Sequence, residues 1–458
     1  MRLVKSITLR ILLMTLGMQL LECGLLNAQD NSPYSRYGLG DITPGTNIVN
    51  RGMGSFSAAY ADPFSVNFNN PASYSAFLSY QEERSKRYAS GRVLLDAALN
   101  FDNHTLREGS SATKFTSSNA LFSYLQVGVP LRKNWGFNFG LRQLTRISYK
   151  ISQIERLFDP VTGQSIDSAV TEFSGNGGVF LGSLGTGFAI KNFSVGLNFG
   201  YLFGNKVYSA KRGFINDTVA YNSSKYNTET SFGNIYGNAG IQYKIDLNRK
   251  LLLRLGVYGN LKQNIGASQD ISRETFIGSQ AGDAQLDSVF QQKNVKGTVI
   301  YPAGYGAGFV IEKKLDPQNN KYGSWLIGLD FVQSNWKDYR FYGVQDSVQN
   351  NWQLKMGGEV RPEPKHNYFS NVTYRAGLML GQDYIHVVDK LPIWGVSVGI
   401  GLPLANYNQL ARTQASMINL ALEYTKRGNN NNLLKDNYFR LSIGFSFSDL
   451  WFIKRKYE

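Results

Sequence analysis

Side chains that could carry out acid–base or nucleophilic chemistry are few in this sequence. Such chemistry needs a nucleophile or an activated water beside a general base, most often a histidine, and the chain contains three histidines and one cysteine. His386 lies close in sequence to Asp383 and Asp389, which makes this the one grouping that could serve. His104 and His366 are predicted to be loop or turn residues. We therefore expect no enzyme activity, no cofactor and no metal site, because ligand spacings rich in Cys and His are also missing.

Two glycine-rich runs could be mistaken for phosphate-binding loops. They are GSLGTGF at 182–188 and GYGAGF at 304–309, but neither has the strand-to-helix context or the lysine of a P-loop. We interpret both runs as glycines inside strands, where a missing side chain lets another segment approach closely.

The charge balance is strongly basic, with 48 Lys and Arg against 33 Asp and Glu and a net charge of +15. Nucleic-acid binding would require these charges on one face together with a recognition motif, and the sequence has no such motif. Many basic residues fall at predicted strand ends, where they would meet lipid phosphates. The alternative is an anion pathway, which would need basic side chains inside the protein. The candidates for that role are Arg142, Arg254, Arg375 and Arg440.

The first 28 residues have the pattern of a secretory signal peptide. Basic residues precede an apolar stretch over 11–26, and Ala28 provides a small residue before the expected cleavage site. A lipoprotein signal around Cys23 is the alternative, but Glu22 stands where such signals need a small residue. After residue 28, no stretch approaches the roughly 20 apolar residues that a membrane-spanning helix requires.

Alternation of apolar with small or polar residues dominates the rest of the chain. From Phe193 to Phe203 every second residue is apolar, and small or polar residues lie between them as far as Gly200. A soluble β-sandwich is the alternative, but its second face would carry more charged and β-branched residues. We predict an all-β fold, a transmembrane antiparallel β-barrel of about 14 strands. The predicted strands are 92–101, 119–129, 135–148, 177–190, 193–207, 230–245, 250–266, 299–313, 323–336, 351–361, 371–382, 393–402, 416–427 and 437–448.

The connections predict how the chain is divided. Long external loops are expected at 102–118, 149–176, 208–229 and 267–298, with shorter periplasmic turns between them. The segment after the signal peptide lacks sustained alternation and begins with turn-forming Pro and Gly residues, which indicates a hatch or plug inside the lumen. The predicted domains are the signal peptide (1–28), the N-terminal hatch (29–90), the barrel (91–448) and a basic periplasmic tail (449–458).

The predicted hatch carries a specific motif near its end. A run of small residues and an Ala-Asp step precede Asn70-Pro71-Ala72, shortly before the first strand. Proline at 71 biases Asn70 away from helix, so the plug should stop there and lead into the barrel. This pattern resembles the hatch of the FadL/TodX family of outer-membrane transporters for long-chain fatty acids and toluene. The matching positions are Ala58, Ala59, Ala61, Asp62, Asn67, Asn70, Pro71 and Ala72.

The two ends of the chain sharpen this resemblance. SPYSRYGLGD at 32–41 and FSDLWFIKRKYE at 447–458 resemble the Bacteroidetes branch of the family. The resemblance implies a channel in the cell outer membrane of a Gram-negative bacterium, for passive uptake of hydrophobic or amphiphilic small molecules and gated by the hatch. The alternative is a non-transporting interaction barrel that serves type IX protein secretion or surface assembly. The implied partners are outer-membrane lipid, a hydrophobic ligand, the barrel assembly machinery during insertion and, for the alternative, secretion-system proteins.

Four tripeptides in the predicted external loops resemble the Bacteroidetes O-glycosylation acceptor, which is Asp, then Ser or Thr, then an aliphatic residue. Turn chemistry is the alternative, since Asp and Ser also cap their own backbone. The acceptor hydroxyls would belong to Ser168, Thr218, Ser288 and Ser347.

Overall fold

The computed structural model describes most of the chain after residue 31. The described residues are 32–81, 88–89, 92–108, 114–215, 222–279, 282–313, 323–363, 365, 367–387, 389–404 and 415–450. The predicted signal peptide and nearly all of the predicted basic tail lie outside them.

One antiparallel sheet closes on itself to form a barrel of fourteen strands, which confirms the predicted fold class. Closure comes from the pairing of the last strand, β20 (Leu434–Leu450), with the first, β4 (Arg92–Glu108). Two barrel positions hold two strands in succession, β10 with β11 and β12 with β13. The other barrel strands are β5 (Lys114–Arg132), β6 (Trp135–Phe158), β7 (Ser165–Ile190), β8 (Phe193–Phe214), β9 (Ser223–Asp246), β10 (Leu251–Asn260), β11 (Gln263–Ser279), β12 (Gly282–Tyr301), β13 (Gly304–Lys313), β14 (Ser324–Ser334), β16 (Asn351–Arg361), β17 (Thr373–His386), β18 (Lys390–Pro403) and β19 (Ala415–Arg427).

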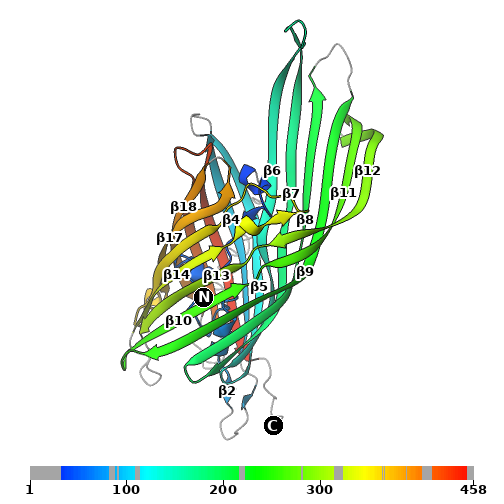
Figure 1. The fold of residues 1–458 in the computed structure, drawn as a ribbon. Helices are drawn as coiled ribbons and strands as arrows, with labels where there is room; N and C mark the ends of the chain where they lie inside the picture. Colours follow the sequence, from blue (N-terminus) through cyan, green and yellow to red (C-terminus); the bar gives the residue numbers. More distant parts are fainter. Residues whose placement is uncertain are drawn as a thin grey trace, which may run out of the picture.

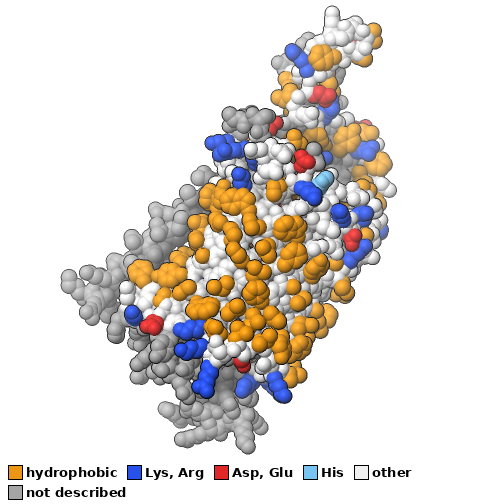
Figure 2. All heavy atoms as spheres, turned by 60° about the vertical axis from the view of Figure 1, so that its left-hand side comes forward, with side chains coloured by type: hydrophobic (Ala, Val, Ile, Leu, Met, Phe, Trp, Pro, Cys, Tyr) orange, Lys and Arg blue, Asp and Glu red, His pale blue; other side chains and the backbone are white. Residues whose placement is uncertain are grey.

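The alternating strands turn their apolar residues outward. In β8, Phe199 is 57% exposed and Tyr201 is 55% exposed. Asn198, which precedes Phe199 and faces the other side of the strand, is buried. Figure 2 shows such side chains gathered into a broad apolar belt, with Lys and Arg below its lower margin. The hydrocarbon core of a bilayer requires a belt of this kind on a barrel wall. No helix in the described part of the chain is long and apolar enough to cross a membrane.

The upper parts of several strands rise above the rest of the barrel as one tall sheet (Figure 1). We call it the external wall, because it contains most of the loops predicted to be external. It leaves the ring at two places. On one side, β5 and β6 pair only from the turn up to Tyr124 and Arg142, and then separate. On the other side, β12 and β13 are separated at Pro302 and β10 and β11 at Leu261, and the upper part of β12 pairs with β11 alone. The upper parts of β6, β7, β8, β9, β11 and β12 make up the external wall.

The long external loops predicted at 102–118, 149–176, 208–229 and 267–298 are wrong for most of their described residues. These residues extend the strands of the external wall and of the β4–β5 hairpin. Both faces of much of the external wall are exposed, so it lacks the apolar alternation on which the prediction depended.

Residues 32–78 run through the interior of the barrel, and we call them the inner segment. Many of its side chains are fully buried, among them Leu39, Met53 and Phe56. The predicted end of the plug at Asn70-Pro71 is wrong in one respect, because a helix begins there and the first barrel strand starts only at residue 92. The elements of the inner segment are η1 (Pro33–Arg36), β1 (Asp41–Ile42), α2 (Ile48–Arg51) and η2 (Pro71–Ala76).

Candidate functional site

The guanidinium of Arg51 fastens the inner segment to three strands of the barrel. The Asn47 side chain caps α2 and orients this short helix, which leaves Arg51 in its last turn fully buried. Nη1 of Arg51 donates to Asn100 Oδ1 at 2.6 Å and to Ser442 Oγ at 3.3 Å. Nη2 donates to Ser123 Oγ at 2.6 Å. The three acceptors belong to β4, β20 and β5, so one side chain holds the inner segment across the closing seam of the barrel.

The tripeptide Asn70-Pro71-Ala72 begins η2 and packs against glycines of the wall. Asn70 caps the helix by accepting a hydrogen bond from the Ala72 amide at 3.1 Å, and its Nδ2 donates to a backbone carbonyl at 2.6 Å. A Cβ at Gly196 would lie 2.3 Å from the Pro71 carbonyl carbon, and one at Gly240 would lie 2.0 Å from Asn70 Oδ1. Only glycine admits so close an approach of the two backbones.

The two glycine-rich runs make different contacts. Gly187 in the first run faces Pro71, whose carbonyl oxygen lies 2.3 Å from where a Cβ would stand, so this run does receive the inner segment. Gly308 in the second run instead faces the Asp330 carboxylate of the neighbouring strand. Asp330 Oδ2 accepts hydrogen bonds from the Ser57 and Ala58 amides at 2.5 and 2.7 Å. The second run therefore makes room for a carboxylate that binds the inner segment.

The four arginines considered for an anion pathway do lie inside the barrel, but each is engaged by another group. Because their charges are paired or hydrogen-bonded, they brace the lumen and do not form an open cationic path. Arg440 binds Asp102 at 2.7 Å, Arg375 binds Glu359 at 2.7 Å, Arg254 binds Glu312 at 2.8 Å, and Arg142 donates to Asn69 Oδ1 at 2.9 Å.

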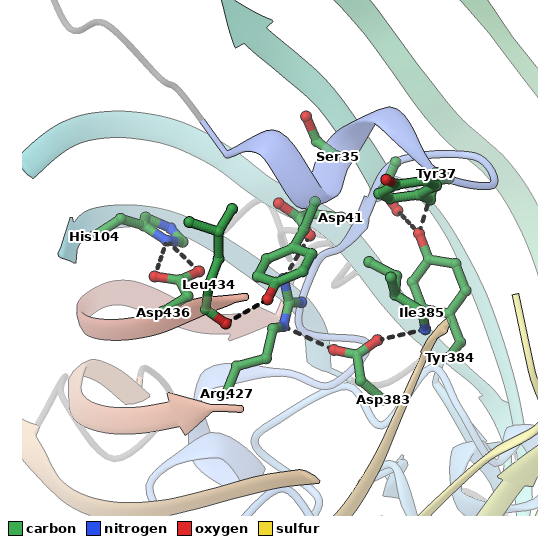
Figure 3. A network of polar contacts seen from close by, with 12 residues as sticks. Ser35, Tyr37, Asp41, His104, Asp383, Tyr384, Ile385, Arg427, Leu434 and Asp436 are labelled. Atoms are coloured by element: carbon green, nitrogen blue, oxygen red, sulfur yellow. Dashed lines mark hydrogen bonds and ion pairs between the residues drawn. The ribbon is translucent and has the colours of Figure 1, made fainter. Parts of the chain in front are cut away.

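A second polar network ties the inner segment to the external mouth of the barrel (Figure 3). Arg427 of β19 forms ion pairs with Asp41 of β1 at 2.8 Å and with Asp383 of β17 at 2.7 Å. The Tyr384 hydroxyl lies 3.0 Å from the Tyr37 carbonyl oxygen, within hydrogen-bonding distance. The external end of the inner segment is therefore held from the β17 and β19 side of the mouth.

A cavity of about 260 Å³ is lined in part by Arg142, the residue of β6 at which β5 and β6 separate. Aromatic side chains line it together with charged ones, including Tyr258, Trp336 and Lys355. A lining of this composition suits an amphiphilic molecule better than a purely apolar one.

The residues of the one acid–base grouping considered, around His386, lie in different environments. Asp383 is buried against Arg427, whereas His386 is exposed. The prediction that His104 is a loop residue is wrong, because it lies on β4 with Nδ1 3.1 Å from the Asp436 carboxylate. His366 lies outside the described residues.

The candidate glycosylation residues fall in different settings. Ser168 and Ser288 lie in strands of the external wall, on β7 and β12, and not in the loops predicted for them. Ser347 is exposed in the connection before β16, as a loop residue should be. Thr218 lies outside the described residues.

Sequence reasoning missed Arg51, Asp330 and Arg427 as anchors of the inner segment. A signal was available for Asp330, which is a carboxylate within the alternating strand at 324–334 and therefore needs an internal partner. No comparable signal exists for Arg51, because its acceptors come from strands that are distant in the sequence.

The fold is similar to that of FadL-type barrels. A FadL homologue from Pseudomonas aeruginosa is similar with a TM-score of 0.55 and 13% identity, over 91% of this chain and 100% of that one. The toluene transporter TodX from Pseudomonas putida is similar with a TM-score of 0.52 and 15% identity, over 90% and 100%. The model of the BamG family matches residues 4–458, and the chain belongs to that family. No curated protein sequence matches the chain.

Proposed function

We propose that this barrel is a plugged scaffold in the assembly of β-barrel proteins, in the outer membrane of a Gram-negative bacterium. The family name supports this role, since Bam stands for β-barrel assembly machinery. The observation that carries the proposal is the buried Arg51, which fastens the inner segment to three barrel strands. In this proposal the predicted hatch (29–90) stays in place, and the protein works through binding at its surface and not through catalysis. Secretion-system proteins are further partners that such a scaffold could serve.

The cost of moving the inner segment supports a fixed plug. Hydrogen bonds to a charged group contribute about 1.5 to 3 kcal/mol each, and a buried partner left unpaired adds its own desolvation cost. Arg51 alone makes three such bonds to the wall, and Asp330 accepts two more from Ser57 and Ala58. Opening a path along the lumen would have to break them together.

The experiment for this proposal is depletion of the protein in the native bacterium. We expect unfolded outer-membrane barrel proteins to accumulate in the periplasm, measured by protease sensitivity and by heat-modifiable gel mobility. Normal folding of other barrels after depletion would contradict the scaffold role. A plasmid copy with an exposed substitution, such as Val161→Asn, is the matched control and should restore assembly.

Passive uptake of hydrophobic or amphiphilic molecules, gated by Asn70-Pro71-Ala72, is the second candidate function. The observation that favours it is the separation of β5 from β6 at Arg142, which also lines a cavity of aromatic and charged residues. Purified protein in liposomes should then speed entry of a fatty acid or toluene at least about tenfold over empty liposomes, with Gly182→Ala as control. A rate equal to that of empty liposomes would remove this candidate.

Modification of the external surface is part of the proposal. The exposed Ser347 and the exposed Ser288 carry the acceptor pattern on that side. Intact-mass measurement of protein purified from its native host should show added sugar, and Ser347→Ala should lower the mass by one glycan. A mass equal to that of the bare chain would exclude glycosylation.

A further inference from the structure

Among the described residues, one edge of the external wall lies on β6. The Ser32 amide donates to the Ser148 carbonyl at 3.1 Å, and none of the described strands pairs with β6 beyond this point on that side. Alternate residues of a strand direct their backbone groups to the same side. The N–H and C=O groups of Ser152 and Ile154 therefore point the same way as those of Ser148. Such an edge can accept an added strand.

A cavity of about 200 Å³ lies beside this edge. Ile151 of β6 lines one side of it, Tyr34 of η1 lines another, and Leu391 and Leu434 come from β18 and β20. Apolar cavities of about 150 Å³ are large enough to hold a benzene ring. The cavity therefore has the size and lining for one aromatic side chain.

Polar contacts fix the position of Tyr34 in the wall of this cavity. The Tyr34 hydroxyl donates to the Leu434 carbonyl at 2.5 Å, and the Arg427 guanidinium lies 5.5 Å from the centre of the Tyr34 ring. Burial raises the pKa of Tyr34 to about 12, so the phenol remains a neutral donor. Leu433 at the mouth of the cavity is 67% exposed. A preformed pocket with an exposed apolar rim loses little entropy on binding.

We infer that the β6 edge and this cavity together form a docking site for an extended polypeptide segment that carries an aromatic residue. The segment would pair with β6 as an added strand, beyond the point where Ser32 contacts Ser148. It would insert one aromatic ring beside Ile151. A small apolar molecule would use the cavity alone, whereas a peptide uses the cavity and the backbone groups of Ser152 and Ile154. This inference rests on the proposed scaffold role and names the chemistry of its partner.

Peptide binding to the full protein in lipid nanodiscs tests the inference. The probe is a fluorescent seven-residue peptide of alternating threonine and valine with a central phenylalanine, and its twin has alanine at the centre. Ile151→Trp fills the cavity, and Ile235→Trp is its control because Ile235 lies on β9, outside the docking site, and is 71% exposed. Ser152→Pro removes an N–H at the edge without removing a bond to β7. Heat-modifiable mobility verifies that each variant is folded.

We expect the phenylalanine peptide to bind at least about tenfold more tightly than its twin, since one buried aromatic anchor often dominates an interface. Ile151→Trp should remove that advantage, Ile235→Trp should keep it, and Ser152→Pro should weaken both peptides at least about tenfold. Equal binding of the two peptides, or unchanged binding to Ser152→Pro, would overturn the inference. Normal barrel assembly in cells that carry both Ile151→Trp and Ser152→Pro would also overturn it, yet would leave the scaffold proposal standing. Failure of the depletion experiment would instead remove the scaffold itself.

Discussion

The lower barrel, by which we mean the closed part of the sheet below the external wall, shares strands with that wall. The two regions differ in closure, in burial and in how their polar groups are paired. In the lower barrel the sheet closes, the lumen is filled by the inner segment, and buried charges such as Arg51 and Arg375 are matched by acceptors. In the external wall the sheet has two edges, and residues such as Ile154 and Val161 are 72% and 90% exposed. Closure and polar satisfaction provide stability, whereas open edges and exposed apolar side chains provide binding capacity. The difference is the one expected if stability resides in the closed part of the barrel and the proposed binding takes place at the open sheet.

The largest expected effect comes from removing the central brace of the lower barrel. Arg51→Met would leave Asn100, Ser123 and Ser442 without their donor, and each buried polar group left unsatisfied costs about 1 to 3 kcal/mol. The urea midpoint of unfolding, followed by heat-modifiable mobility, should fall accordingly. Arg156→Met in the external wall is the control. Equal midpoints for the two variants would contradict the expected difference in stability between the lower barrel and the external wall.

A smaller effect is expected where the inner segment touches the wall through glycine. Gly196→Ala places a Cβ 2.3 Å from the Pro71 carbonyl carbon, and overpacking of this kind costs about 1 to 3 kcal/mol. Gly182→Ala is the matched control, because no atom lies within 4 Å of where its Cβ would stand. Both variants can be compared by the same urea titration. If Gly182→Ala were as destabilising as Gly196→Ala, close approach of the inner segment would not explain the loss.

The smallest effect is expected in the external wall. Ile154→Ser changes a side chain that is 72% exposed and should alter the free energy of unfolding by less than about 0.5 kcal/mol. Hydrogen exchange sharpens the comparison, because amides at a sheet edge open with a lower free energy than those of a closed ladder. Peptides from 284–292 should therefore exchange faster than peptides from 393–402. The reverse order would show that the wall is the more stable region.

The sequence predicts the lower barrel well and the external wall poorly, for a physical reason. Lipid on one face and a filled lumen on the other force alternation, so all fourteen predicted segments overlap barrel strands, for example at 193–207 and 416–427. Water on both faces of the wall removes that constraint, so the sequence predicts a loop for strand residues within 149–176. The interruption at Pro302 lay inside a predicted strand, although proline there was a local signal of a break.

The residues of the candidate site also fall into two groups, those that the sequence identifies and those that it does not. The tripeptide Asn70-Pro71-Ala72 was identifiable because a proline after asparagine has local conformational consequences. The partners of Arg51 and the contact of His104 with Asp436 were not identifiable, because strands hundreds of residues apart bring them together. Local sequence signals identify the elements of the site. The contact partners of their side chains become known only from the closed barrel.

A reversible cross-link between the inner segment and the wall tests the fixed plug most directly. The Ile48 Cβ lies 3.4 Å from where a Cβ at Gly444 would stand, close to the roughly 3.5 to 4.5 Å of a disulfide, so Ile48→Cys with Gly444→Cys should join α2 to β20. The single cysteine of the sequence, Cys23, lies in the predicted signal peptide and should not interfere. With the disulfide formed, verified by non-reducing gel mobility, we expect barrel assembly in depleted cells to be restored as well as by the reduced or single-cysteine protein. Loss of function on oxidation and its recovery on reduction would show that the inner segment must move, and would contradict the plugged scaffold.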